Sequence, residues 1–193
     1  NLESLMVYSN EISNEGVTHL ARLPNLSGLT ELKIAWNEID DRATEAIVES
    51  QTLGQIRSLR LDGSFTDQTL RLIAGSPRFQ NLQKLTLNGS YMDELRAPGF
   101  SDRGLRELST GLFETPIEEL AFQRNLKRGF GRALENSPRL TQVKRLNLGW
   151  CEVEDDDVVL MARHLRDVEE LHLEGNAITN RGANALSESP LLS

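Results

Sequence analysis

The residues with the clearest chemical potential lie near the end of the chain, around His172. Glu170 and Glu174 flank this histidine two residues away on either side, which places all three side chains on one side of a strand. Such a carboxylate–imidazole cluster could serve as an acid–base pair or as part of a metal site. A solvated histidine is the simpler interpretation. We therefore predict no catalytic residues, no metal site and no cofactor.

Other motifs typical of catalysis are absent from the sequence. It has no glycine-rich phosphate loop, no nucleophile elbow and no HExxH or CxxC pattern. The single cysteine, Cys151, allows no internal disulfide, so we expect a reducing, cytoplasmic location. The net charge of −8 argues against a nucleic-acid binder, and the apolar runs are too short to span a membrane. We expect neither nucleic acid nor membrane as a partner.

A leucine pattern recurs along the chain and must position all of these residues. It reads LxxLxLxxN or a close variant, and its copies begin at residues 2, 29, 56, 82, 117, 143 and 168. This period is typical of leucine-rich repeats. The fourth and sixth positions of the pattern lie on one side of a strand, and apolar residues at helical spacing follow them. Each repeat should therefore be a short strand followed by a helix.

These repeats predict an α/β fold, a right-handed leucine-rich repeat solenoid of about seven repeats. Parallel strands should line its concave face and helices its convex face. We treat residues 1–193 as a single domain, because a solenoid grows by stacking and has no internal domain boundary. Neither end carries a recognisable cap. We therefore expect a fragment of a longer array, with neighbouring repeats or domains of the parent chain packed against its ends.

Repeat length, helix content and the tail NAITNRGANALSESPLL resemble leucine-rich repeats of the ribonuclease-inhibitor type. The element A-L-x-x-S-P-x-L occurs over residues 133–140 and begins again at residue 185. Its regularity resembles bacterial members of that class. The cysteine at the ninth position of one repeat resembles the subtype found in F-box proteins. The resemblance implies a fold and carries no catalytic residues.

Two charged runs occupy the loops between strand and helix in consecutive repeats. The basic run holds Arg124, Lys127, Arg128 and Arg132, and the acidic run spans residues 152–157. Stacked repeats bring such loops within about one strand spacing, ~5 Å, so we expect the runs to neutralise each other. Anion or RNA binding by the basic run and cation binding by the acidic run are the alternatives.

Departures from the pattern are the best candidates for a binding site. The fourth repeat is longer than the others because of an insertion at 91–98, YMDELRAP, which could contact a partner or be a neutral surface loop. Both tryptophans, Trp36 and Trp150, occupy the eighth position of their repeats, at the rim of the concave face. They could bind a partner or cover neighbouring backbone.

We predict a non-catalytic protein–protein interaction module that binds a protein partner on its concave face and rim loops. The alternatives are a substrate-recognition or sensor segment of a larger protein, such as an F-box-type adaptor or regulator, and a GTPase-activating-type regulator. A mixed, polar concave face suits a protein better than a phosphate backbone. The predicted partner-binding residues are Met6, Tyr8, Lys33, Trp36, Arg60, Asp62, Tyr91, Met92, Gln123, Arg145, Trp150 and His172.

Overall fold

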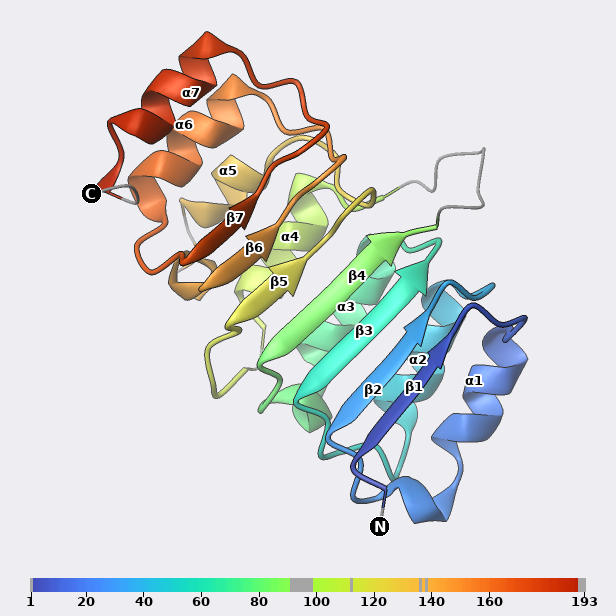
Figure 1. Ribbon diagram of the computed structural model, residues 1–193. Helices are drawn as coiled ribbons and strands as arrows, with labels where there is room; N and C mark the ends of the chain where they lie inside the picture. Colours follow the sequence, from blue (N-terminus) through green and yellow to red (C-terminus); the bar gives the residue numbers. More distant parts are fainter. Residues whose placement is uncertain (1, 91–98, 112, 136, 138, 191–193) are drawn as a thin grey trace.

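The computed structural model describes residues 2–90, 99–111, 113–135, 137 and 139–190. Seven parallel strands form one open sheet in the order of the chain (Figure 1). They are β1 (Ser4–Tyr8), β2 (Glu31–Ala35), β3 (Ser58–Gly63), β4 (Lys84–Gly89), β5 (Glu119–Ala121), β6 (Arg145–Asn147) and β7 (Glu170–His172). The leucine at the fourth position of each repeat pairs with its equivalent in the next strand, as Leu5 does with Leu32. The predicted fold class is confirmed.

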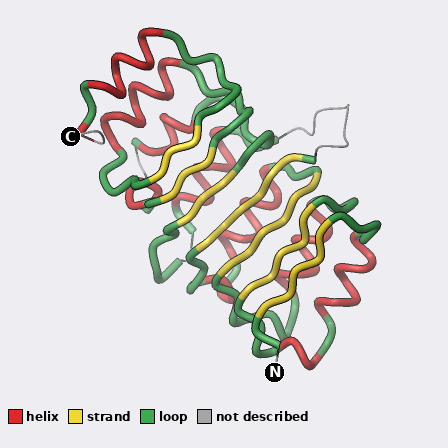
Figure 2. The backbone as a smooth tube through the Cα atoms, viewed as in Figure 1, coloured by secondary structure: helices red, strands yellow, loops and turns green. Residues whose placement is uncertain are grey.

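A helix follows every strand, and all the helices lie on one face of the sheet (Figure 2). They are α1 (Asn14–Ala21), α2 (Asp41–Glu49), α3 (Asp67–Gly75), α4 (Asp102–Ser109), α5 (Phe130–Leu134), α6 (Asp155–His164) and α7 (Asn180–Ser187). Short 3₁₀ helices at Pro24–Leu26, Pro77–Phe79 and Leu140–Gln142 lead into the next strands. The opposite sheet face, which we call the open face, is the predicted concave face. Among the described residues, no helix is long and apolar enough to cross a membrane.

The core lies between the sheet and the helices, where the leucines of neighbouring repeats stack. Side chains in the middle repeats, such as Leu59 and Leu85, are fully buried. Those of the terminal repeats, such as Leu5 and Leu171, are only half-buried because each has a neighbour on one side alone. This gradient follows directly from stacking, since one repeat cannot bury its own apolar face.

Helix starts are tied together by aspartates at the first helical position. Asp41 of α2 accepts hydrogen bonds from the backbone nitrogen and the hydroxyl of Thr66, the N-cap of α3, at 3.0 and 2.6 Å. Asp67 of α3 does the same for Ser101, the N-cap of α4. The series is interrupted at α5, whose N-cap is Gly129 with φ of +108°, and resumes where Asp155 of α6 binds Thr179, the N-cap of α7. A Cβ on Gly129 would lie 2.8 Å from the Cβ of Asp102.

Candidate functional site

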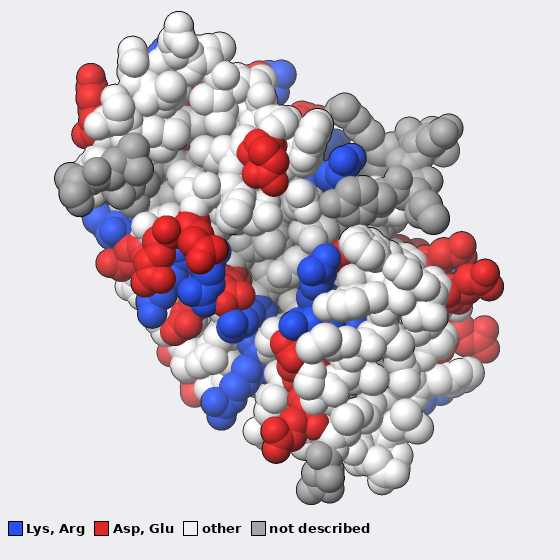
Figure 3. Space-filling model, in the orientation of Figure 1, with Lys and Arg blue, Asp and Glu red and all other residues white. Residues whose placement is uncertain are grey.

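The open face carries charges of both signs that pair along and between the strands. Lys33 binds Glu31 on its own strand at 2.6 Å. Glu119 of β5 forms ion pairs with Lys84 of β4, at 2.6 Å, and with Arg145 of β6. It therefore links three neighbouring strands. Burial works to raise the pKa of Glu119, but hydrogen bonds from these two cations outweigh it and hold that pKa below its usual range. The mixed-sign face is visible over β5 to β7 (Figure 3).

Aromatic and charged side chains gather where the first three strands end. The guanidinium carbon of Arg60 lies 5.7 Å from the ring centre of Tyr8, and the rings of Tyr8 and Trp36 are 6.4 Å apart. Arg60 also donates two hydrogen bonds to Asp62, at 3.2 and 2.9 Å. We call Tyr8, Trp36, Arg60 and Asp62 the N-terminal cluster. Four predicted binding residues, drawn from three repeats, thus come together.

Asp62 departs from its predicted role in partner contact. It is only 1% exposed and its carboxylate is held by Arg60. Asp62 lies on β3, which runs one residue beyond it to Gly63, whereas β2 ends at Ala35, the equivalent of Asp62. Asp62 therefore orients Arg60 and is not accessible to a partner.

Trp36 adopts a left-handed backbone conformation that Ser9, Arg124 and Trp150 share at the eighth position of their repeats. Its φ is +56°, in the left-handed region that favours glycine, and its side chain is 55% exposed. Asn37 stabilises this turn, because its amide nitrogen donates to the carbonyls of Val7 and Ala35 at 2.9 and 3.0 Å. The amide oxygen of Asn37 accepts from the backbone nitrogen of Ile12 at 3.1 Å. The sequence alone located Trp36 at the rim but gave no sign of this strain.

Trp150 has the same turn and a similar exposure, with φ of +56° and 53% of the side chain exposed. Its ring covers the Cα of Gly175, where an added Cβ would lie 2.4 Å from a ring atom. The guanidinium carbon of Arg124 lies 5.2 Å from the ring centre. We call Arg124, Trp150 and Gly175 the C-terminal cluster. Trp150 thus covers neighbouring backbone, one of its two expected roles, and contact of its exposed ring with a partner stays a prediction.

Several other predicted residues lie on the same surface. Met6 and Lys33 lie on β1 and β2 of the open face, Arg145 on β6 and His172 on β7. Gln123 follows β5, and its side-chain nitrogen is 3.5 Å from a carboxylate oxygen of Glu174. Tyr91 and Met92, with the rest of the insertion 91–98, lie outside the described residues.

The cluster around His172 does not take the form of a compact site. Its Nε2 atom is 4.0 Å from Glu170, and both side chains are more than half exposed. Glu174 contacts Gln123 instead. Within the described part of the chain, no group of three or more histidines, cysteines and acidic residues is placed to hold a metal ion. Burial raises the pKa of the Cys151 thiol to about 11, which keeps it protonated at neutral pH.

Among the described residues, Arg128 of the basic run forms an ion pair with Glu154 of the acidic run at 2.9 Å. This ion pair links the two runs, as expected from the stacking of their loops. Asp157 accepts a hydrogen bond from the backbone nitrogen of Gly131 at 3.0 Å, and Asp155 accepts from Thr179 at the start of α7. Most of the acidic run thus serves helix starts, where carboxylates are favoured by the helix dipole.

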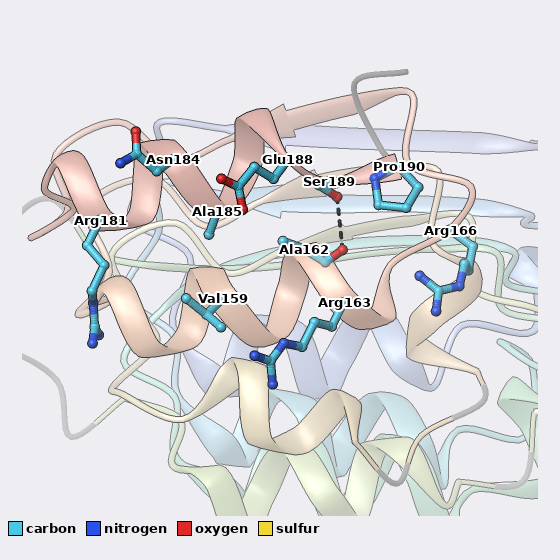
Figure 4. Close-up of a pocket in the computed structure, with 10 residues that line it drawn as sticks. All are labelled: Val159, Ala162, Arg163, Arg166, Arg181, Asn184, Ala185, Glu188, Ser189 and Pro190. Carbon is cyan, nitrogen blue, oxygen red and sulfur yellow. Dashed lines mark hydrogen bonds between the residues drawn. The ribbon is translucent and has the colours of Figure 1, made fainter.

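Two hollows accompany these clusters. A cleft of about 860 Å³ lies at the ends of β1 to β3, and Trp36, Glu38 and Gly63 are among its lining residues. A second hollow of about 510 Å³ lies between α6 and α7, away from the open face (Figure 4). In this second hollow Ser189 donates to the carbonyl of Ala162 at 2.9 Å. Sequence reasoning did not identify either hollow, although the loops that follow consecutive strands must lie side by side.

Comparison with known proteins agrees with the repeat structure. The family described as Leucine Rich repeat matches residues 27–48, 140–162 and 164–187, which correspond to the second, sixth and seventh repeats. The other repeats continue the same strand register. Three matched repeats, together with seven stacked strand–helix units, show a leucine-rich repeat fold. Leucine-rich repeats generally serve as scaffolds for protein interaction.

One similar solved structure is a crystal structure of an internalin from Listeria monocytogenes. It is 13% identical in sequence, and the match covers 97% of this chain and 85% of that chain with a TM-score of 0.25. No protein of curated function matches the chain.

Proposed function

We propose that this chain is a non-catalytic protein–protein interaction module that binds its partner on the open face and the adjoining rim. The observation that carries the proposal is the state of Trp36 and Trp150. Each exposes more than half of a large apolar side chain, and each holds a left-handed backbone conformation that disfavours bulky residues. The left-handed turn itself belongs to the eighth position of the repeat, since Ser9 and Arg124 also adopt it, and the exposed aromatic rings are what supports a binding surface.

The charges of the open face support a protein partner over a phosphate backbone. Lysines and arginines there are paired with carboxylates, as in Lys33 with Glu31 and Arg60 with Asp62. A nucleic-acid surface requires cations that face the phosphates in excess. No residue of the described surface favours the adaptor, sensor or GTPase-activating alternatives over this proposal.

Substitution of the exposed apolar residues tests the proposal directly. Met6→Ala with Trp36→Ala should reduce capture of the partner by the immobilised chain at least tenfold, as expected when an interface loses two apolar contacts. Leu23→Ala is the matched control, since Leu23 is 45% exposed but lies between α1 and the first 3₁₀ helix. Equal losses in both variants would reject the open face as the binding surface. Arg60 is unsuitable for this test because its loss would leave buried Asp62 unpaired.

Cross-linking provides an independent measurement, because the chain has four lysines. Lys33 and Lys84 lie on strands of the open face, whereas Lys127 lies in the loop after β5. Amine-reactive cross-links from Lys33 and Lys84 to the captured partner are expected. Cross-links confined to Lys127 would place the partner on the loops away from the open face.

A further inference from the structure

The hollow between α6 and α7 stays open because two of the side chains that line it are small and apolar. Val159 of α6 and Ala185 of α7 both line this space, one from each helix (Figure 4). They are the fifth and the sixth residue after the N-caps of their helices, Glu154 and Thr179. We call this space the helix hollow.

The groove between α3 and α4 shows what the same two positions do when their side chains are charged. There the fifth and the sixth residue after the N-caps Thr66 and Ser101 are Arg71 and Glu107. The Nε atom of Arg71 lies 2.8 Å from a carboxylate oxygen of Glu107, so an ion pair bridges that groove. A valine and an alanine form no such bridge, which leaves the helix hollow open.

Charge is unevenly distributed along the helix hollow. At one end Arg181 of α7 forms ion pairs with Asp155, at 3.6 Å, and with Asp156, both in the first turn of α6. At the other end lie Arg163, in the last turn of α6, and Arg166, just after α6 ends. Both are exposed, and neither forms an ion pair with a residue that the structure describes. One end is therefore neutralised within the chain, and the other end keeps two positive charges.

The two guanidinium groups keep most of their hydrogen-bonding capacity. Arg166 donates to the carbonyl of Leu165 at 3.3 Å, and the guanidinium of Arg163 donates no hydrogen bond to the described part of the chain. A guanidinium presents its donors in a planar fork that matches a carboxylate. The helix hollow thus offers two carboxylate-binding groups beside apolar side chains, on a chain whose net charge is −8.

We propose that the helix hollow binds an acidic segment of a protein, whose carboxylates pair with Arg163 and Arg166. An apolar side chain of the same segment covers Val159 and Ala185. Charge complementarity carries the assignment, because an acidic segment supplies the ion-pair partners that these arginines lack among the described residues. The helices lie on the other side of the sheet from the open face, so this interaction is separate from the proposed interface there (Figure 2).

An acidic peptide fits the helix hollow better than a phosphate or polyphosphate does. Glu188 also lines the hollow and repels a dense polyanion that extends along it. A peptide can place carboxylates at Arg163 and Arg166 and an uncharged side chain near Glu188. Small anions are therefore competitors in the test and not the proposed ligand.

The binding test uses a fluorescein-labelled peptide in which glutamates flank a central leucine. Matched peptides carry glutamine or lysine in place of glutamate. Fluorescence anisotropy of the glutamate peptide should rise saturably as the chain is added, and the affinity should fall as salt rises. The glutamine and lysine peptides should not bind. Failure of the glutamate peptide to bind, or equal binding of the glutamine peptide, would overturn the proposal.

Two pairs of variants with the same net charge test the role of the arginines. Arg163→Gln with Arg166→Gln should weaken binding of the glutamate peptide roughly tenfold, because both partners of its carboxylates are lost. Arg22→Gln with Arg57→Gln removes two exposed arginines from other repeats and should leave binding unchanged. Equal weakening by both pairs would show general electrostatic attraction and reject the hollow as the site.

A third variant closes the helix hollow without changing the net charge. Val159→Arg with Ala185→Glu reproduces the ion pair that Arg71 and Glu107 form between α3 and α4, and it should abolish peptide binding. Circular dichroism checks that this variant is folded, and if it is not, the two glutamine pairs decide the test. Binding retained by the folded variant would place the peptide elsewhere.

Further measurements identify the occupant. Pyrophosphate should displace the peptide no better than sodium chloride of the same ionic strength, since stronger displacement would assign the hollow to small anions. Self-association in sedimentation that disappears in the Arg163→Gln, Arg166→Gln variant would make a second copy of the chain the occupant and overturn the proposal. Met6→Ala with Trp36→Ala should leave peptide binding unchanged, so failure here and failure of the open-face interface are separate results.

Discussion

The N-terminal and C-terminal clusters are built on the same turn, yet their tryptophans have different surroundings. Trp36 and Trp150 share a φ of +56° and nearly equal exposure. Trp36 stands beside an open cleft, at the end of strands five or six residues long. Trp150 lies between Arg124 and Gly175, where the strands are three residues long. The same local conformation therefore places one exposed ring against Tyr8 and the other against Arg124 and Gly175.

The ninth position of the repeat explains how firmly each turn is held. Asn37 makes two donor bonds and one acceptor bond to backbone groups. Cys151 at the equivalent place contacts the matching carbonyls of Phe122 and Gly149 through sulfur, at 3.2 and 3.5 Å. A thiol is a weak single donor, so it holds the same turn less strongly.

The largest expected effect is on stability, from truncation of these two residues. Asn37→Ala should lower the free energy of unfolding by about 3 kcal/mol, because it leaves buried backbone groups unsatisfied. Cys151→Ala should cost about 1 kcal/mol, since a weak donor and one buried atom are lost. Urea denaturation measures both. Equal losses would show that the two turns are stabilised by something other than the ninth position.

Replacing each tryptophan by glycine sharpens the comparison between the rings. Trp36→Gly should lower the free energy of unfolding by only about 0.5 kcal/mol, because relief of the left-handed strain offsets the added freedom of the unfolded chain and the tilted contact with Tyr8 is lost. Trp150→Gly should lose about 1.5 kcal/mol, since packing on Gly175 and stacking with Arg124 disappear. Thermal denaturation distinguishes them. A larger loss for Trp36 would show that the contacts of Trp36 stabilise the fold more than those of Trp150 do.

Glu119 links the two halves, and its substitution has an intermediate effect. Glu119→Gln should cost about 1 kcal/mol at neutral pH, allowing for partial exposure of the ion pairs with Lys84 and Arg145. The pKa of Glu119 is lowered in the folded state, so this contribution is present above the ordinary glutamate pKa of ~4.3. It is lost as pH falls through the lowered pKa.

Stability measured against pH checks this prediction. The difference between wild type and Glu119→Gln should shrink on acidification. Glu31→Gln is the comparison variant, because Glu31 forms its ion pair within one strand, with Lys33, and is joined to β1 by a hydrogen bond from the Ser4 hydroxyl. Its loss should therefore be smaller than that of Glu119. A difference that persists at low pH would show that the glutamine disturbs packing and not charge.

Periodicity predicted the fold well because the leucine pattern repeats a single physical requirement, burial of one strand face against one helix. The rim tryptophans were also found, since their position follows from the register. The cleft could not be predicted, because it is lined by residues from three repeats and by Gly63, which has no side chain to fill the space. The burial of Asp62 was missed for a similar reason, since the alternation of a strand does not reveal how far that strand extends.

The smallest expected effect concerns the two charged runs. Arg128 and Glu154 form an ion pair whose side chains are 68% and 42% exposed, so solvent screens most of their attraction. A double-mutant cycle of Arg128→Ala and Glu154→Gln should give a coupling energy of about 0.5 kcal/mol or less.

Two other carboxylates of the acidic run contribute more to stability. They are Asp155 and Asp157, which bind backbone nitrogens at the starts of α7 and α5. Asp157→Asn should therefore destabilise the chain more than Arg128→Ala does, as measured by urea denaturation. The opposite order would restore neutralisation between the runs as the main role of the acidic segment.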